Sequence, residues 1–204
     1  MAVLKNQEHC EDNHKRKWEI VDGVITLMSP SPGIYHNIVK GNIFALFHNH
    51  LKGKPCKVFT DNTDVKLNQE NTYVPNVSIV CDKSKYQGKN AIYGAPDLVV
   101  EILSPRTSSY DRGRKKEVYG ASGVKEYWLV DVNNLTVEVY LQQNGHLVMD
   151  EFYTIITNYE TEKLEQKGEP LPPKSLKTTL FDDLTIYLEE VFEDVYKEIL
   201  GEDS

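Results

Sequence analysis

The stretch Gly94–Trp128, GAPDLVVEILSPRTSSYDRGRKKEVYGASGVKEYW, places one acid inside an otherwise apolar strand and follows that strand with a basic helix. Its apolar run from Leu98 to Leu103 lies between two prolines, as is typical of a strand covered on both faces. Glu101 interrupts this run. An isolated buried carboxylate costs many kcal/mol of desolvation, so it must be protonated, paired with a cation or bound to a metal. Position 101 therefore holds either one half of a structural ion pair or a functional acid.

The residues after this strand predict a helix from about Arg112 to Ala121, with Asp111 as its N-cap. Its first turn carries four cations, although cations at a helix N-terminus oppose the helix dipole; they are Arg112, Arg114, Lys115 and Lys116. Two interpretations follow. The cations form a solvated basic face, or a lysine points back at the carboxylate end of the strand, where a phosphate or metal would gather both signs of charge.

Length and charge limit the class of protein. With 204 residues and 40% hydrophobic content, the chain can bury one good core. We expect Met1–Lys17 to be a flexible charged arm, rather than a metal site built on His9, Cys10 and His14, and residues 18–204 to form a single domain. The formal charge of −8 excludes binding of nucleic acid through overall positive charge, so any such contact must be local or assisted by a metal.

The cysteines and the hydropathy of the chain bear on its location. Cys10, Cys56 and Cys81 are three in number and stand in no CxxC spacing, which favours a reducing cytoplasm and argues against a disulfide framework. No segment approaches 18 consecutive apolar residues, and the first 17 residues are too polar for the core of a signal peptide. We therefore expect a soluble cytoplasmic protein without membrane contact.

The remaining segments predict a mixed α/β chain. Asp22-Gly23 between two apolar runs is the strongest hairpin signal in the sequence. Apolar positions recur with helical spacing from about Ile34 to Leu51, and this helix carries His36 near its start, where the imidazole could face a site. Further elements are expected over these segments: strands at Lys57–Leu67 and Tyr73–Cys81, a strand at Glu126–Asp131 parallel to that of Glu101, an antiparallel extension at Leu135–Leu141, a weaker strand at Leu147–Ile156, a loop at Tyr159–Lys177 and a helix at Phe181–Leu200.

Several of these segments resemble the Uma2 family, also called DUF820, whose members are restriction-endonuclease-like proteins related to the PD-(D/E)XK nucleases. The resemblance is carried by WEIVDGVITLMSP followed by His36, and by VPNVSIV, PDLVVEILSPRT and YDRGRKKEVYGASGVKEYWLVD, collinear over about Trp18–Leu141. It implies an α/β restriction-endonuclease-like core in the order αβββαβ, with a mixed central sheet flanked by helices, an N-terminal hairpin and a C-terminal helix. It also implies a divalent-metal phosphodiesterase site, a DNA substrate and, because related nucleases often pair to cut two strands, a homodimer.

The resemblance assigns site residues position by position. The family's acid at the end of the second strand falls on Asn76, its strand acid on Glu101, and the lysine usual two residues later on Leu103. In this family the lysine has moved to the following helix, in a D-x-x-x-K pattern that Asp111 and Lys115 meet. Asn76 is therefore the departure, since an aspartate is the rule after the preceding proline.

These residues predict a weakened metal site. Glu101, the amide oxygen of Asn76 and the carbonyl of Ile102 can serve as hard ligands to Mg²⁺ or Mn²⁺, and Lys115 can polarise water or stabilise charge. Asp97, four residues before Glu101, lies about 13 Å away along an extended strand, so a strand-entry role suits it better. Two hypotheses remain open. One is a metal-dependent DNA nuclease whose metal site departs from the family pattern at Asn76, and the other is a catalytically weak or inactive member that acts as a DNA-binding or protein-interaction module.

Overall fold

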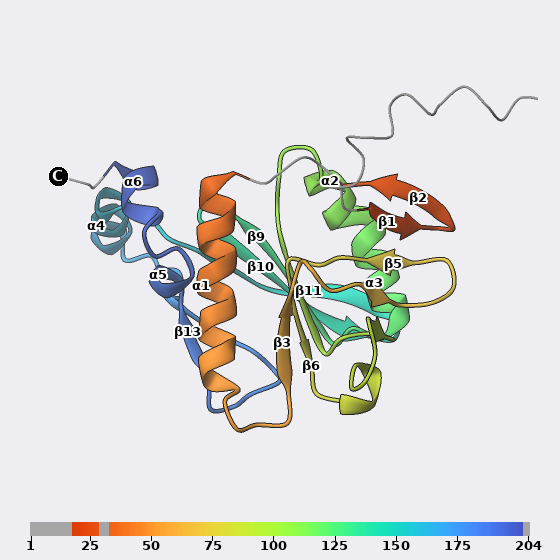
Figure 1. The fold of residues 1–204 in the computed structure, drawn as a ribbon. Helices are drawn as coiled ribbons and strands as arrows, with labels where there is room; N and C mark the ends of the chain where they lie inside the picture. The colour runs from red at the N-terminus through yellow and green to blue at the C-terminus, as the bar shows by residue number, and fades with distance from the viewer. Residues whose placement is uncertain (1–17, 29–32, 202–204) are drawn as a thin grey trace, which may run out of the picture.

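A six-stranded sheet forms the centre of the computed structural model, which describes residues 18–28 and 33–201 (Figure 1). Strands β8 and β9 run parallel, and the other neighbouring strands of this sheet run antiparallel. The order across the sheet is β11 (His146–Thr154), β10 (Thr136–Gln143), β9 (Glu126–Asp131), β8 (Leu98–Ile102), β6 (Val77–Val80) and β3 (Lys57–Thr60). The predicted parallel pair, its antiparallel extension and the weaker strand after it are all confirmed.

Two smaller sheets accompany the central one. The first begins with the predicted hairpin, whose turn residues Asp22 and Gly23 both have positive φ angles, of 49° and 78°. Its order is β2 (Val24–Leu27), β1 (Trp18–Val21), β5 (Thr72–Tyr73), β4 (Val65–Lys66) and β7 (Ile92–Tyr93). The second pairs β12 (Ser175–Lys177) with β13 (Thr185–Tyr187).

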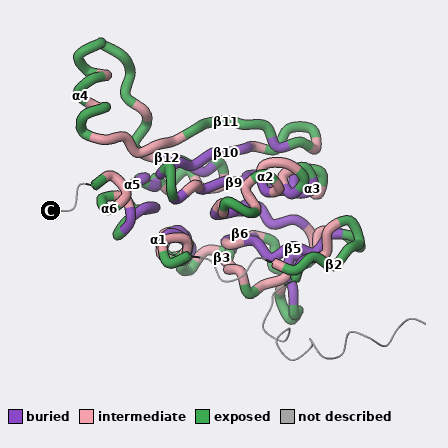
Figure 2. The backbone as a smooth tube through the Cα atoms, turned by 90° about the horizontal axis from the view of Figure 1, so that it is seen from above, coloured by how far each residue is buried: buried purple, intermediate pink, exposed green. Residues whose placement is uncertain are grey.

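Helices cover both faces of the central sheet. Figure 2 shows α1, α5 and α6 on one side, and α2, α3 and the sheet that contains β1 and β5 on the other. Together these elements confirm the mixed α/β architecture. The helical segments are α1 (Ile34–His50), η2 (Lys83–Lys85), α2 (Ser108–Tyr110), η3 (Asp111–Lys115), α3 (Lys116–Ser122), α4 (Asn158–Lys167), α5 (Leu188–Val191) and α6 (Tyr196–Leu200).

The alternation of side chains along β8 decides which face receives the acid. Val100 and Ile102 point into a core with Val39 and Phe47 of α1, whereas Val99 points into a second core with Tyr119 of α3. Successive residues of a strand point to opposite faces. Glu101 therefore shares the face of Val99, beside α3 and the smaller sheet.

Two predicted strands are each divided between two sheets. The segment Lys57–Leu67 contributes β3 to the central sheet and β4 to the smaller sheet. The segment Tyr73–Cys81 begins at the end of β5, in the smaller sheet, and continues as β6 in the central sheet. Asp61–Asp64 and Val74–Asn76 connect the paired strands. The prediction of one strand over each of these segments is therefore wrong.

The helix after β8 begins earlier than predicted and is irregular. It starts at Ser108 and passes through the π-helical turn Asp111–Lys115, in which Gly113 has non-helical angles of φ −104° and ψ −106°. Asp111 lies inside the helical run, buried, so its prediction as the N-cap is wrong. Asp111 and Lys115, at the two ends of this wide turn, are both buried.

The C-terminal third differs most from the sequence prediction. The expected loop contains α4, which starts with a capping box between Thr157 and Glu160. The expected single helix at Phe181–Leu200 is instead β13, α5 and α6, and Asp194 between the helices has a φ of 64°, which a continuous helix does not allow. The C-terminal helical segment is thus present in two short pieces.

A disulfide joins Cys56 and Cys81, whose neighbours Lys57 and Val80 form the first register pair of β3 and β6. The sequence argued against a disulfide framework and did not foresee this bridge, because the pairing depends on strand register and not on spacing along the chain. None of the helices in the described residues is long and apolar enough to cross a membrane. Met1–Lys17, with His9, Cys10 and His14, lies outside the described residues.

Candidate active site

The Lys115 ammonium lies at the centre of a cluster of three carboxylates. Its Nζ is 2.9 Å from Oε1 of Glu101, 3.1 Å from Oε1 of Glu19 and 3.8 Å from Oδ1 of Asp111. All four residues are between 3% and 6% exposed. The predicted proximity of Glu101 and Lys115 is thus present, and the lysine does point back at the carboxylate end of the strand. We call these four residues the carboxylate–lysine cluster.

Two buried tyrosines support this cluster. The hydroxyl of Tyr119, on α3, donates to Oε1 of Glu101 over 3.0 Å. The ring of Tyr73, on β5, lies with its centroid 5.5 Å from Nζ of Lys115, within range of a cation–π interaction. These contacts fix the lysine and the strand acid from two sides.

Glu19 is the residue of the cluster that the sequence did not reveal. It lies on β1, and its Oε1 also accepts a hydrogen bond of 2.9 Å from the backbone N–H of Val74. Its signal was the one used for Glu101, an acid between apolar residues of a predicted strand, here Trp18 and Ile20. The hairpin prediction treated this strand as scaffold and so missed it.

Asn76 lies beside the cluster and not within it. Its Oδ1 accepts a 2.8 Å hydrogen bond from the backbone N–H of Ile102. Asn76 immediately precedes β6, whose first residue Val77 pairs with Val100, so Asn76 lies next to the C-terminal end of β8. The three predicted ligands Asn76, Glu101 and Ile102 are therefore neighbours at one end of the sheet.

The charges of the cluster do not balance. Burial, the largest influence, raises the pKa of Glu101 to about 7, although Lys115 opposes this rise. Burial likewise raises the pKa of Asp111. For Lys115, burial lowers the pKa, but the carboxylates of Glu101, Glu19 and Asp111 outweigh burial and hold it well above its ordinary value. The lysine is therefore protonated at neutral pH, while two of the acids resist ionisation.

This imbalance fits an additional cation. Three ionised carboxylates against one ammonium leave two excess negative charges in a site shielded from water, where their repulsion is poorly screened. A proton or a divalent ion would relieve it. Within residues 18–28 and 33–201, however, no three His, Cys, Asp or Glu side chains converge as ligands of one ion. A metal would thus depend on backbone and amide oxygens besides carboxylates.

His36 lies across the sheet from Glu101, next to the backbone of Ile102. Burial and the Lys40 ammonium lower its pKa and outweigh the effect of Ile102, so the imidazole is neutral at pH 7. Its Nδ1 is buried without a hydrogen-bond partner in the described structure. His36 was expected to face the site, and it approaches only the Ile102 backbone and not the Glu101 carboxylate.

The other charged residues singled out in the sequence have structural partners. Asp97 accepts from the backbone N–H of Cys81 and pairs with Lys125 over 2.8 Å, which agrees with its strand-entry role. Arg112 donates to Glu138, and Arg114 pairs with Asp22. The basic face of the helix is thus partly ion-paired, and Lys115 is the cation directed inward.

Comparison with known proteins identifies the family. The Uma2 family, described as "Putative restriction endonuclease", matches residues 5–179. The chain belongs to the Uma2 family. An uncharacterized protein of Synechocystis sp. is 32% identical over 163 residues, which cover 78% of this chain and 80% of the relative.

A solved structure agrees with the Uma2 assignment at the level of the fold. It is described as a "putative nuclease belonging to DUF820 from Anabaena variabilis", and it superposes with a TM-score of 0.63. The superposition covers 86% of this chain and 89% of that one, at 20% sequence identity. At this identity the likeness shows the fold alone. The restriction-endonuclease-like fold predicted for this Uma2 chain is thereby confirmed.

Proposed function

We propose that this protein is a divalent-metal-dependent nuclease that hydrolyses DNA phosphodiester bonds at the carboxylate–lysine cluster. The observation that carries the proposal is a protonated lysine held among three carboxylates that are all less than a tenth exposed. Excess negative charge in a buried cluster is costly unless a proton or a bound cation neutralises it, and we assign a divalent cation to this role. The nuclease family and the fold of its structural neighbour support the same reaction class.

The proposed metal is Mg²⁺ or Mn²⁺, held by Glu101, the amide oxygen of Asn76 and the main-chain carbonyl of Ile102. These are the hard oxygen ligands that both ions prefer. The Asn76 oxygen and the Ile102 backbone already lie together through their 2.8 Å hydrogen bond. When bound, such an ion would lower the pKa of a water and neutralise charge on the phosphate.

The protein's own groups supply the remaining requirements of phosphodiester hydrolysis. The Lys115 ammonium offsets negative charge that develops on the phosphorus-bound oxygens. Glu19 and Asp111 hold this ammonium in place, and Tyr119 holds Glu101. Because each of these groups is fixed by a second contact, little reorganisation is needed when a phosphate reaches the site.

A second candidate function is binding of DNA or protein without cleavage. Two observations favour it: Asn76 brings no negative charge to the site, and the four cluster side chains are almost fully enclosed. In this case the cluster is a structural ion network, and its negative charge is balanced by the Lys115 ammonium and by protonation of Glu101. A homodimer, which the family resemblance implies, is part of either proposal and can be tested by analytical ultracentrifugation.

The deciding experiment combines metal binding with cleavage. If the nuclease proposal holds, calorimetry detects Mn²⁺ binding to the wild-type protein, and Glu101→Gln abolishes both this binding and plasmid cleavage. A Tyr159→Phe variant, changed at an exposed residue of α4, serves as the control and should keep the metal binding and cleavage of the wild type. Absence of metal uptake by the wild type and by Asn76→Asp would instead support the non-catalytic module.

A further inference from the structure

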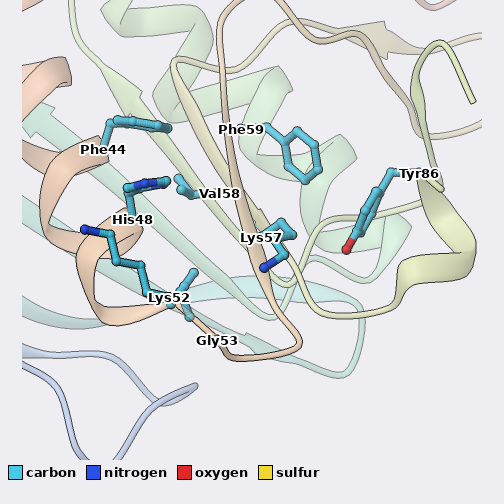
Figure 3. Close-up of a pocket in the computed structure, with 9 residues that line it drawn as sticks. Phe44, His48, Lys52, Gly53, Lys57, Val58, Phe59 and Tyr86 are labelled. Atoms are coloured by element: carbon cyan, nitrogen blue, oxygen red, sulfur yellow. The ribbon is translucent and has the colours of Figure 1, made fainter. Parts of the chain in front are cut away.

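A groove of about 640 Å³ lies on the free edge of the central sheet, at strand β3. Figure 3 shows Phe44 and His48 of α1 on one side of β3, and Phe59 and Tyr86 on the other. It is distinct from the carboxylate–lysine cluster, since none of the cluster residues lines it.

Aromatic side chains line this groove on both sides of β3. Phe44 and His48 stack at 5.3 Å between ring centroids, and Phe59 meets Tyr86 edge-to-face at 5.1 Å. His48 is exposed, and the other three rings are partly exposed. Flat, accessible rings of this kind stack with nucleobases of any sequence, because every base has a π-face.

The groove is also locally cationic in an acidic protein. The chain carries a formal charge of −8, yet the lining residues include the exposed Lys52 and Lys57 and contain no aspartate or glutamate. Aromatic rings interleaved with lysines are the combination by which proteins hold single-stranded nucleic acid, with the bases on the rings and the phosphates near the ammonium groups.

We propose that this groove binds a single-stranded segment of nucleic acid that extends from the cluster. The choice of ligand rests on the proposed nuclease function. Helix α1 links the two places: His36 lies next to Ile102 and His48 lines the groove, twelve residues and so about 18 Å further along the helix. At about 3.4 Å per nucleotide, this length corresponds to roughly five stacked nucleotides.

The orientation of the strands agrees with such a path. Strands β3 and β8 both run antiparallel to β6, so they run parallel to one another. Lys57 at the start of β3 therefore lies toward the end of the sheet opposite Glu101. A nucleic-acid strand bound in the groove would run along the edge of β3 from Lys57 toward Thr60, at the end of the sheet where Glu101 lies.

Binding can be measured without cleavage by fluorescence anisotropy of a labelled twelve-nucleotide oligothymidylate in EDTA. We expect the double variant Lys52→Glu/Lys57→Glu to weaken binding by about tenfold or more at low salt. The slope of log K against log salt should fall by about 1.4, from two phosphate contacts at about 0.7 each. Tyr86→Leu, which keeps apolar volume but removes the ring, should weaken binding by about fivefold or more.

Matched controls lie on α4, away from the groove. Lys163→Glu/Lys167→Glu makes the same charge change, and Tyr159→Leu removes an exposed ring. Thermal unfolding of every variant confirms that the fold is retained. Equal binding by wild-type and groove variants, or equal loss in the α4 controls, would overturn the proposal.

Further results distinguish nucleic acid from other polyanions as the ligand, and distinguish failure of the groove proposal from failure of the nuclease proposal. Binding of polyglutamate with the same affinity and the same dependence on Lys52 and Lys57 would overturn the assignment to nucleic acid. Because the assay contains no metal and no cleavage step, an inactive enzyme that still binds oligothymidylate through the groove would disprove the nuclease alone. Cleavage that is indifferent to all groove variants would disprove the groove alone.

Discussion

The Lys115 ammonium lies 2.9 Å from Oε1 of Glu101, and this contact joins the irregular helix after β8 to the strand before it. Both groups are buried, and Glu19 reaches the same ammonium from a different sheet. Strand β8, the helix that follows it and the distant strand β1 thus depend on one cation. Removal of that cation should have a larger effect than removal of any one acid, because it leaves all three carboxylates without their partner.

We predict that Lys115→Met destabilises the protein by about 3–5 kcal/mol, the usual cost of leaving buried charges unpaired. The measurement is urea unfolding at pH 8. Lys116→Met is the matched control: the neighbouring lysine is only half-buried and contacts the ring of Tyr140, so its loss should cost about 1 kcal/mol or less. Adding Glu101→Gln to Lys115→Met should restore part of the lost stability. Equal effects of the two single variants would contradict this account.

The raised pKa of Glu101 predicts how stability varies with pH. Its folded value of about 7 lies above the ordinary 4.5, so the folded state binds a proton that the unfolded state has already released between these two pH values. The contribution of Glu101 to stability is therefore complete below pH 4.5 and is lost as the pH rises to about 7. The loss amounts to about 3 kcal/mol, from about 1.36 kcal/mol per pKa unit. The difference in unfolding free energy between wild type and Glu101→Gln, measured from pH 4.5 to 8, should show this fall.

Metal binding should have the opposite dependence on pH. A metal requires the ionised carboxylate, so Mn²⁺ affinity should fall by about tenfold for each pH unit below 7. Tyr119→Phe removes a hydrogen bond to ionised Glu101, which should raise the pKa of this acid further. The fall in Mn²⁺ affinity on acidification should then begin at a higher pH. Calorimetry at several pH values tests both statements. A flat profile between pH 5.5 and 7 would mean that Glu101 is not a ligand.

How far the sequence predicts the site depends on which interactions are local. An acid within an apolar strand, followed by a basic helix, left a solvated basic face and an inward lysine both open, and the family resemblance singled out Lys115 as the partner of Glu101. Glu19 was not predicted, because its role follows from β1 pairing with β5 at Ile20 and Thr72, a contact between distant segments. Asp111 was assigned as an N-cap because a π-turn has no distinct sequence signal.

The fold shows the same difference between features set by local sequence and features set by contacts between distant segments. The hairpin, α1 and the parallel pair of β8 and β9 follow from turn residues and hydrophobic periodicity. The division of two segments between two sheets does not, since short apolar runs have the same pattern in either sheet. The missed helix α4 did carry a signal, the capping box of Thr157 and Glu160, which the nearby prolines obscured.

The disulfide gives a prediction that is independent of catalysis. Cys56 and Cys81 are 25 residues apart, and closing a loop of this length in the unfolded chain contributes about 3.5 kcal/mol of stability. Reduction should therefore lower the melting temperature by about 10 °C for a chain of this size. A Cys56→Ser/Cys81→Ser variant should melt at the temperature of the reduced protein and be insensitive to reductant. Titration of three free thiols in protein purified without reductant would contradict the bridge.

Asn76→Asp is the variant that most directly tests the metal site. Its carboxylate can still accept the hydrogen bond from the Ile102 backbone, so the start of β6 keeps its geometry. The added charge lies beside the cluster, next to Ile102, and should lower stability in EDTA because the cluster already holds excess negative charge.

With saturating Mn²⁺ the same variant should become more stable than the wild type, because a ligand that binds the folded state stabilises it in proportion to RT ln(1 + [L]/Kd). We expect Mn²⁺ affinity and plasmid cleavage to rise by about 10- to 100-fold, the range found when groups around a metal are altered. Asn133→Asp adds the same charge at an exposed turn and should change neither quantity. Destabilisation of Asn76→Asp that Mn²⁺ does not reverse would show that no ion binds between positions 76 and 101, and the non-catalytic function would then be the better account.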